Sequence, residues 1–319
     1  MDKQKVAVGV DIGGTNTVYG FVTEAGVCLA QSSFSTSTYP VFENFVRELA
    51  MHIGLKYKAL GNKYELVGVG VGAPNASYIT GFIEHAVNLV WDKHLPLVKL
   101  LGAYLQLPVI LTNDANAAAL GEMHFGGATG MKNFMVITLG TGLGCGLVLD
   151  GEIYNGSEGY AGEMGHIIVR EQGRSCACGR KGCLETYVSA KGIKRTVSKL
   201  LAKYDGPSVL RDIPFNKFSA KKLAIAAYNG DRVAIEAFEY TGRLLGKTIA
   251  NVAAICNPEA VFLSGGLAKA GDLILKPTQY HMEANLLSVL KGKIKLNLSS
   301  IKSNAGVLGS AALVFMSGH

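Results

Sequence analysis

The chain has 319 residues, enough for about two domains of ordinary size with a cleft between them. Hydrophobic residues make up 49% of it and charged residues 17%, a balance that excludes an intrinsically disordered protein or a highly charged tail. The excess of 31 Lys and Arg over 24 Asp and Glu gives a net charge of +7, which favours an anionic ligand such as a nucleotide or a phosphosugar.

Nucleic acid is the alternative anionic partner, but the basic residues are scattered along the chain. Five of them follow the spacing of one solvated helix face: Lys191, Lys194, Arg195, Lys199 and Lys203. No apolar stretch reaches about 18 residues, and the start of the chain lacks the apolar core of a signal peptide. We therefore predict a cytoplasmic protein that binds neither nucleic acid nor membranes.

The first half of the chain predicts strands mixed with helices. An apolar run, Val6–Val10, stops at the turn sequence Asp11-Ile-Gly-Gly-Thr-Asn-Thr and resumes as Val18–Val22, which is the pattern of a β-hairpin. The elements expected next are a helix near Val41–Tyr57 and strands at Leu66–Val71 and Val109–Thr112.

The second half repeats the hairpin pattern and is more helical. Phe134–Leu139 is followed by Gly140-Thr-Gly-Leu-Gly and by Cys145–Leu149, so two copies of one unit predict a duplicated fold. Ser219 marks the start and Gly230 the end of one helix, and the strand Ala260–Leu263 comes later. The last helix, Gly306–Phe315, is expected to pack back onto the first lobe.

No Pro-rich linker separates the two lobes, so continuous secondary structure near Ala115–Met123 is expected to join them. We expect residues 1–115 with 305–319 to form a smaller N-terminal lobe. Residues 116–304 would then form the larger C-terminal lobe.

Three glycine turns directly follow apolar strands, where exposed backbone N–H groups can approach phosphate oxygens closely. Each turn alone is better explained as a tight hairpin connection, but three together, each at a strand end, favour a nucleotide site. The chain has no G-x-x-x-x-G-K-[ST] motif, so a P-loop is disfavoured. The candidate phosphate-binding residues are Gly13, Gly14, Thr15, Asn16, Gly140, Thr141, Gly142, Gly265 and Gly266.

Asp11 stands where the first strand meets its glycine turn. A carboxylate there is placed to hold Mg²⁺ beside the phosphates, either directly or through water. The alternative is hydrogen bonding within the turn.

His166, Cys176, Cys178 and Cys183 supply one imidazole and three thiols within eighteen positions. This set matches tetrahedral zinc ligation, and four protein ligands leave no open position, so the predicted Zn²⁺ is structural. A redox pair is the alternative, but Cys176-Ala-Cys178 lacks the Cys-x-x-Cys spacing of such sites.

Asp114 is the best candidate for a catalytic base. Phosphoryl transfer to an alcohol needs a carboxylate that accepts the hydroxyl proton, and Asp114 lies between the strand Val109–Thr112 and the helix that starts at Ala115. The alternative is that Asp114 caps this helix, and from the residues alone the two interpretations stay level.

Four segments resemble the ROK family (repressors, open reading frames and sugar kinases): Asp11-Ile-Gly-Gly-Thr, Asn113-Asp114-Ala-Asn-Ala, Gly162-Glu163-Met-Gly-His166 and Cys176-Ala-Cys-Gly-Arg-Lys-Gly-Cys-Leu-Glu185. The resemblance spans nearly the whole chain, and the cysteine segment is its most specific part. It implies the two-lobed α/β fold of actin/hexokinase-like (ribonuclease H-like) ATPases, with an interlobe cleft, and a homodimer.

The resemblance also implies an activity, the ATP-dependent phosphorylation of a hexose at its 6-hydroxyl, with Asp114 as the base. Asn113 would hold a neighbouring hydroxyl. The other sugar-binding residues would be Asn88, Glu163, His166 and Glu185. Zinc on one ring nitrogen of His166 would direct the other toward the sugar.

Glucose is the favoured substrate because Cys183-Leu-Glu-Thr is similar to the glucose-directed members. Tyr160 departs from the small residue that many of those members carry, so N-acetylmannosamine, N-acetylglucosamine, fructose and allose remain alternatives. A non-enzyme alternative is a sugar-responsive transcriptional regulator without its DNA-binding region, since only Met1–Lys5 precede the first strand.

Overall fold

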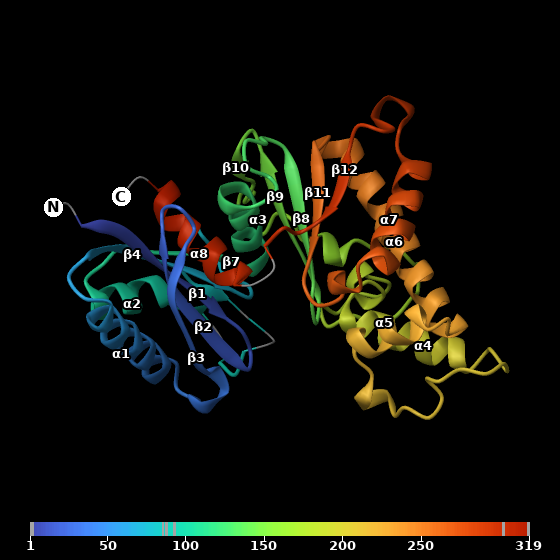
Figure 1. The fold of residues 1–319 in the computed structure, drawn as a ribbon, viewed down its shortest axis with the longest axis horizontal. Helices are drawn as coiled ribbons and strands as arrows, with labels where there is room; N and C mark the ends of the chain where they lie inside the picture. The colour runs from blue at the N-terminus through green and yellow to red at the C-terminus, as the bar shows by residue number, and fades with distance from the viewer. Residues whose placement is uncertain (1–2, 85, 87–88, 92–93, 302–303, 318–319) are drawn as a thin grey trace. The chain divides into compact units, whose positions relative to one another are not determined.

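The computed structural model describes residues 3–84, 86, 89–91, 94–301 and 304–317. The chain forms two compact units, each made of segments that are distant in sequence (Figure 1). The first unit comprises Met1–Met131, Ile153–Ala161 and Ser300–His319, and the second comprises Lys132–Glu152 and Gly162–Ser299. Within the described residues, no helix is both long and apolar enough to span a membrane.

The first unit is built on a five-stranded sheet with the order β3-β2-β1-β4-β7. The first three strands are antiparallel neighbours, whereas β4 runs parallel to β1, and β7 runs parallel to β4. The strands are β1 (Gln4–Ile12), β2 (Asn16–Thr23), β3 (Cys28–Ser35), β4 (Tyr64–Ala73) and β7 (Val109–Asn113). A short ribbon of β5 (Ile83–Glu84) and β6 (His94–Leu95) belongs to the same unit.

Helices cover both faces of this sheet. On one face, the apolar stripe of α1 (Phe42–Leu60) packs with α2 (Leu97–Leu105) against alternate valines of β1 and β4. These valines are Val6, Val8 and Val10 of β1 and Val69 and Val71 of β4. On the other face, α8 (Ala305–Met316) packs on β1 and β4 and against α3 (Asp114–Phe125) (Figure 1). Glycines in the strands permit this contact, since an added Cβ at Gly9 or Gly70 would come within 1.8 Å of a carbonyl oxygen of α8.

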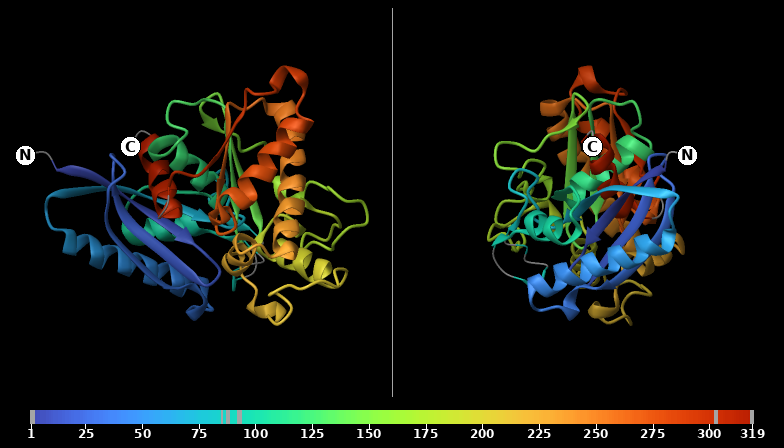
Figure 2. Two further views of the ribbon diagram at one scale, coloured as in Figure 1. Left: turned by 45° about the vertical axis from the view of Figure 1, so that its right-hand side comes forward. Right: turned by 90° about the vertical axis from the view of Figure 1, so that its left-hand side faces the viewer.

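The second unit has a five-stranded sheet with the order β10-β9-β8-β11-β12. Its antiparallel pair β8–β9 continues into parallel β11 and β12. The strands are β8 (Phe134–Leu139), β9 (Leu143–Leu149), β10 (Glu152–Ile153), β11 (Ala260–Ser264) and β12 (Lys295–Leu298). The helices are α4 (Ala190–Leu201), α5 (Ala220–Tyr228), α6 (Arg232–Cys256) and α7 (Asp272–Asn285), and α6 and α7 lie side by side (Figure 2).

The predicted duplication is confirmed, because in both sheets an antiparallel hairpin is followed by two parallel strands. Helix α5 begins after Ser219 as predicted, and the Ser219 hydroxyl accepts a hydrogen bond from the N–H of Lys222. The last helix packs on the first unit, also as predicted. The observed units differ from the expected boundaries of 1–115 with 305–319 and 116–304. Helix α3 lies wholly in the first unit, because α8 covers its alanine-rich face, and the chain crosses to the second unit only after Met131.

Replacement of Gly70 tests the close contact between β4 and α8. We expect Gly70→Ala to lower the free energy of unfolding by about 3 kcal/mol, since the backbone of α8 must move away from the new methyl group. Gly54→Ala is the matched control, because no described atom outside the neighbouring backbone of α1 lies within 4 Å of that Cβ position. The control should gain up to about 1 kcal/mol from helix propensity. Urea unfolding measures both, and equal stability of the two variants would contradict the contact.

Candidate active site

Asp114 is the first residue of α3, directly after β7, as the sequence predicted. The helix is capped by Asn113, whose amide oxygen accepts a hydrogen bond from the N–H of Asn116 at 2.6 Å. The alternative in which Asp114 itself caps the helix is therefore wrong. The Asp114 side chain keeps solvent-accessible surface, yet the surrounding protein desolvates its carboxyl group and raises its pKa, against the opposing effect of nearby backbone N–H groups.

Asp11 lies at the same edge of the first sheet, because parallel pairing aligns it with Gly72 of β4, which in turn pairs with Thr112 of β7. Burial, followed by the negative charge of Asp114, raises the pKa of Asp11 to about 6. The carboxylate packs at the start of α8, where an added Cβ on Gly306 would be 2.3 Å from its Oδ2 atom. The positive ends of α3 and α8 thus lie close to two carboxyl groups.

The turn after Asp11 is a tight hairpin in which the N–H of Gly13 donates to the carbonyl of Asn16 at 3.0 Å. Thr15 and Asn16 are exposed at its tip, and the carbonyl of Thr15 accepts a hydrogen bond from the N–H of Thr36. The first unit therefore combines this turn with Asp11, Asn113 and Asp114.

The two glycine turns of the second unit are neighbours because β8 and β11 are parallel and end together. The N–H of Leu267 donates to the carbonyl of Leu139 at 3.0 Å, and Gly265, with φ of 91°, packs against the same residue. Among the described residues, no heavy atom beyond the adjoining residues lies within 4 Å of the position that a Cβ would take on Gly140 or Gly266. These open positions leave backbone accessible to a phosphate group, which fits the predicted nucleotide contacts.

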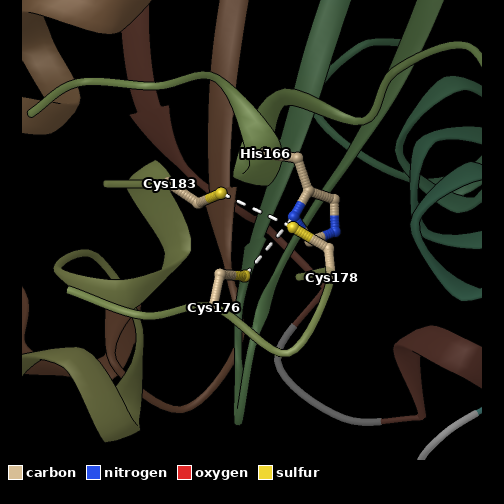
Figure 3. Close-up of side chains that lie close together, drawn as sticks. All are labelled: His166, Cys176, Cys178 and Cys183. Atoms are coloured by element: carbon tan, nitrogen blue, oxygen red, sulfur yellow. Dashed lines mark hydrogen bonds between the residues drawn. The ribbon is translucent and has the colours of Figure 1, made fainter. Parts of the chain in front are cut away.

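His166, Cys176, Cys178 and Cys183 converge in the second unit, with their ligand atoms all within 4.8 Å of one another (Figure 3). The Nδ1 atom of His166 faces the sulfurs, 3.7 Å from Cys176 Sγ, and the sulfurs of Cys178 and Cys183 are 3.6 Å apart. Backbone hydrogen bonds close the loop, including Cys176 N–H to the carbonyl of Arg180. Tetrahedral zinc with Zn–S bonds near 2.3 Å requires sulfurs about 3.8 Å apart, so the side chains present fit this ion.

The other ring nitrogen of His166 points away from the thiols. Its Nε2 atom lies 3.7 Å from Oε2 of Glu163, three residues earlier in the chain. The imidazole therefore directs Nδ1 toward the three thiols and Nε2 toward a carboxylate that the sequence predicted to bind sugar.

Glu185 links the cysteine loop to the glycine turn. Its Oε2 atom accepts a hydrogen bond from the N–H of Leu143 at 3.2 Å, and its Oε1 atom lies 3.4 Å from Cys176 Sγ. Gly142 makes room for this carboxylate, because an added Cβ would be 2.4 Å from Oε2. The Glu185 side chain thus contacts both the cysteine loop and the glycine turn, which lies about 40 residues earlier in the sequence.

Arg174 supports the cysteine loop, a role that sequence reasoning missed. Its guanidinium group donates to the carbonyls of Thr186 and Gly192 at 2.8 and 2.9 Å and lies over the ring of Tyr187. A single arginine in a Gly-rich loop carries no local signal of such contacts, which depend on where α4 begins.

The structure brings the predicted residues together in two groups, one in each unit. The first group is Asp11, Gly13, Gly14, Thr15, Asn16, Asn113 and Asp114, and the second is Gly140, Thr141, Gly142, Glu163, His166, Cys176, Cys178, Cys183, Glu185, Gly265 and Gly266. Asn88 lies outside the described residues.

The chain combines four features of the sugar kinase and repressor class. They are duplicated sheets in an α/β fold, glycine turns at strand ends, a carboxylate at a strand–helix junction and a Cys/His loop. The chain belongs to the ROK family, whose model matches residues 7–316.

The glucokinase of Halalkalibacterium halodurans is 38% identical over 314 residues, which cover 96% of this chain and 94% of that protein. The crystal structure of a ROK family glucokinase from Streptomyces griseus in complex with glucose and AMPPNP has a TM-score of 0.82 and 31% identity, covering 98% and 99% of the two chains. The xylose repressor of Bacillus subtilis is 26% identical, covering 98% of this chain and 77% of the repressor. The likeness to the Streptomyces structure confirms the predicted hexokinase-like α/β fold class.

The two carboxyl groups make the stability of the ligand-free protein depend on pH. The folded pKa of Asp11, about 6, lies above its ordinary value, so the folded state holds a proton that the unfolded state has released between about pH 4 and 6. Stability from this group is present below that range and is lost as the pH rises through 6.

We therefore expect Asp11→Asn to melt at a higher temperature than the wild type at pH 8, with the difference shrinking toward pH 4.5. Thermal unfolding without Mg²⁺ or nucleotide measures this. Asp205→Asn, at an exposed position of the second unit, is the control and should follow the wild type. A constant difference across the pH range would contradict the raised pKa.

Proposed function

We propose that the protein is a glucokinase, which transfers the γ-phosphoryl group of ATP to the 6-hydroxyl of glucose. The likeness to glucokinases over nearly the full length of both chains carries this conclusion. The placement of Asp114 supports it, because a carboxylate at a solvent-accessible strand–helix junction is available to a bound alcohol.

Asp114 takes the proton of the 6-hydroxyl as the phosphoryl group is transferred. Its raised pKa brings its basicity closer to a neutral operating pH, which strengthens a general base that must still be ionised to act. Asn113 uses its amide oxygen to cap α3, so its NH₂ group is the part that donates to a neighbouring sugar hydroxyl.

The glycine turns bind the phosphates of ATP through backbone N–H groups. Asp11 holds Mg²⁺, since two nearby carboxyl groups with raised pKa values favour a cation that compensates their charge. The ion, when bound, neutralises phosphate charge. Asp11 and Asp114 belong to the first unit, and two of the three glycine turns belong to the second.

The Cys/His cluster binds a structural zinc ion through Nδ1 of His166 and three thiolates. Ligation through Nδ1 leaves the proton on Nε2, which donates toward a sugar hydroxyl beside Glu163. Glu185 accepts from the sugar on the same side, while its bond to Leu143 N–H restrains its direction. Asn88, which lies outside the described residues, is proposed as a further sugar ligand.

Glucose remains the favoured substrate, with N-acetylmannosamine, N-acetylglucosamine, fructose and allose as alternatives. The departure at Tyr160 is compatible with glucose, because its hydroxyl is already bonded to Glu84. We also propose that the enzyme acts in the cytoplasm as a homodimer. The relation to xylose repressors motivates the alternative of a regulator, for which sugar-sensitive DNA retardation would be the evidence.

Asp114→Asn tests the catalytic base. We expect kcat to fall by about 10²–10⁴-fold while calorimetry shows glucose binding in the wild-type range, because the amide keeps the shape but cannot accept the proton. ADP release is measured against glucose and the alternative sugars, with Asp205→Asn as the control. Unchanged turnover would remove Asp114 as the base, and a wild-type protein that turns over no sugar would exclude the kinase.

Metal analysis tests the zinc site. We expect about one zinc ion per purified chain, and we expect Cys178→Ser to lose the ion together with glucose affinity. Cys28→Ser is the matched control, because Cys28 lies in the first unit on β3. Full glucose affinity in metal-free protein would exclude the proposed role of the ion.

A further inference from the structure

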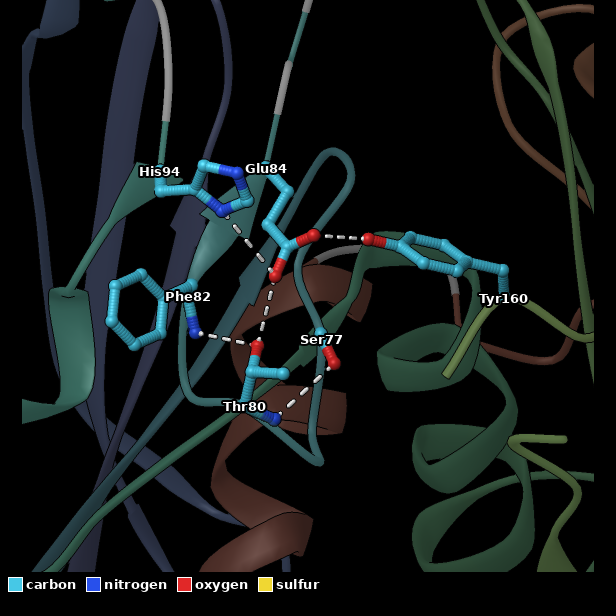
Figure 4. A network of polar contacts seen from close by, with 6 residues as sticks. All are labelled: Ser77, Thr80, Phe82, Glu84, His94 and Tyr160. Carbon is cyan, nitrogen blue, oxygen red and sulfur yellow. Dashed lines mark hydrogen bonds and ion pairs between the residues drawn. The ribbon is translucent and has the colours of Figure 1, made fainter. Parts of the chain in front are cut away.

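The hydroxyl of Tyr160 donates a hydrogen bond of 2.6 Å to Oε2 of Glu84 (Figure 4). Both residues belong to the first unit. A short bond from a phenol to a carboxylate is of the charge-assisted kind, about twice as strong as a neutral one. The bond raises the pKa of Tyr160 to about 12, with burial and neighbouring carboxylates adding to the effect, so the phenol stays a donor at any working pH.

Glu84 is a fixed acceptor rather than a loose surface carboxylate. Its Oε1 atom accepts from the hydroxyl of Thr80 at 3.2 Å and lies 3.8 Å from Nδ1 of His94, the residue opposite it in the β5–β6 ribbon. Its backbone N–H donates to the carbonyl of Asn75 at 3.0 Å. Only 17% of the side chain is exposed, so the position of this carboxylate is set by the ribbon and the preceding loop.

Tyr160 comes from a segment, Ile153–Ala161, that belongs to the first unit although second-unit residues flank it on both sides. One end is tied by Asn155, whose amide oxygen accepts a hydrogen bond from Asn116 of α3 at 3.3 Å. The other end is tied by Tyr160. Gly159 allows the chain to pass close to the ribbon's loop, because an added Cβ would be 2.9 Å from Oγ of Ser77.

The proposed sugar-binding residues Glu163 and His166 follow Tyr160 directly in the sequence. Glu163 follows Tyr160 by three residues, a span of at most about 10 Å of extended chain, and His166 follows three residues later. Glu84 in turn is the last residue of β5. The hydrogen bond therefore holds the segment that leads to Glu163 and His166 to this strand of the first unit.

We propose that Tyr160 is a positioning residue for the sugar, acting through its hydrogen bond to Glu84. This role rests on the proposed glucokinase function. The bond fixes where the segment leading to Glu163 leaves the first unit, and it thereby limits the positions open to that carboxylate when glucose binds. Glucose binding without the bond must also order this segment, so affinity falls while the chemical step is unaffected.

Tyr160→Phe removes the hydroxyl and keeps the ring. We expect the KM and the calorimetric Kd for glucose to rise about 5- to 10-fold, because part of the binding free energy must then order the segment, with kcat and the KM for ATP within about twofold of the wild type. Tyr154→Phe is the matched control, since Tyr154 is a half-exposed residue of the same segment whose hydroxyl has no partner among the contacts described. The control should keep wild-type values.

Glu84→Gln shows whether the effect passes through the bond. The variant keeps an acceptor but loses its charge, so a smaller rise of about threefold in KM is expected, and adding Tyr160→Phe to it should cost less than the same change costs in the wild type. Wild-type glucose affinity in Tyr160→Phe, or full additivity of the two changes, overturns the positioning role while leaving the glucokinase function intact. A wild-type protein that neither binds nor phosphorylates any hexose overturns both.

Discussion

The parallel pairing of strands in each sheet is the constraint on which the candidate site depends. Parallel neighbours end at the same edge, so residues that follow different strands lie close together there although they are far apart in sequence. In the first unit this brings Asp11 of β1 to the edge where β7 ends at Asn113 and Asp114. In the second it places the glycine turns after β8 and β11 side by side. The duplicated topology therefore supplies two edges, each carrying residues of the candidate site.

The carboxyl pair of the first unit is held against its own electrostatic preference. Desolvation disfavours the charged form of both side chains, and the charge of Asp114 adds to the raised pKa of Asp11. The N-terminal ends of α3 and α8 offset part of this cost, since their free N–H groups favour nearby anions. Ionised carboxylates in this empty site lower the stability of the folded protein, and cations or hydroxyl donors of a ligand would compensate their charge. Such a cost in stability is common where a site serves activity.

The cysteine loop is connected to neighbouring elements by side chains that lie outside the proposed metal-ligand set. The loop is held to α4 by Arg174 and to the turn after β8 by Glu185. Glu185 also lies against Cys176, so one carboxylate contacts both a proposed metal ligand and a backbone N–H of the turn. The imidazole of His166 extends the same relation toward Glu163.

The sequence by itself determined the features that are local: the cysteine spacing that forms one cluster, the glycine turns at strand ends, the junction at Asp114 and the duplicated hairpin. These follow from periodicity and turn chemistry within about twenty residues. The structure shows that Asn113, not Asp114, caps α3 through a local bond to Asn116. Only the tertiary structure decided that Nδ1 of His166 faces the thiols.

The structure alone also assigned α3 to the first unit and paired Tyr160 with Glu84 across 76 positions of sequence. The physical reason is that these outcomes depend on long-range packing. The helix that covers α3 is the last of the chain, and the acceptor of Tyr160 lies on a ribbon formed far earlier, so no local pattern encodes either contact.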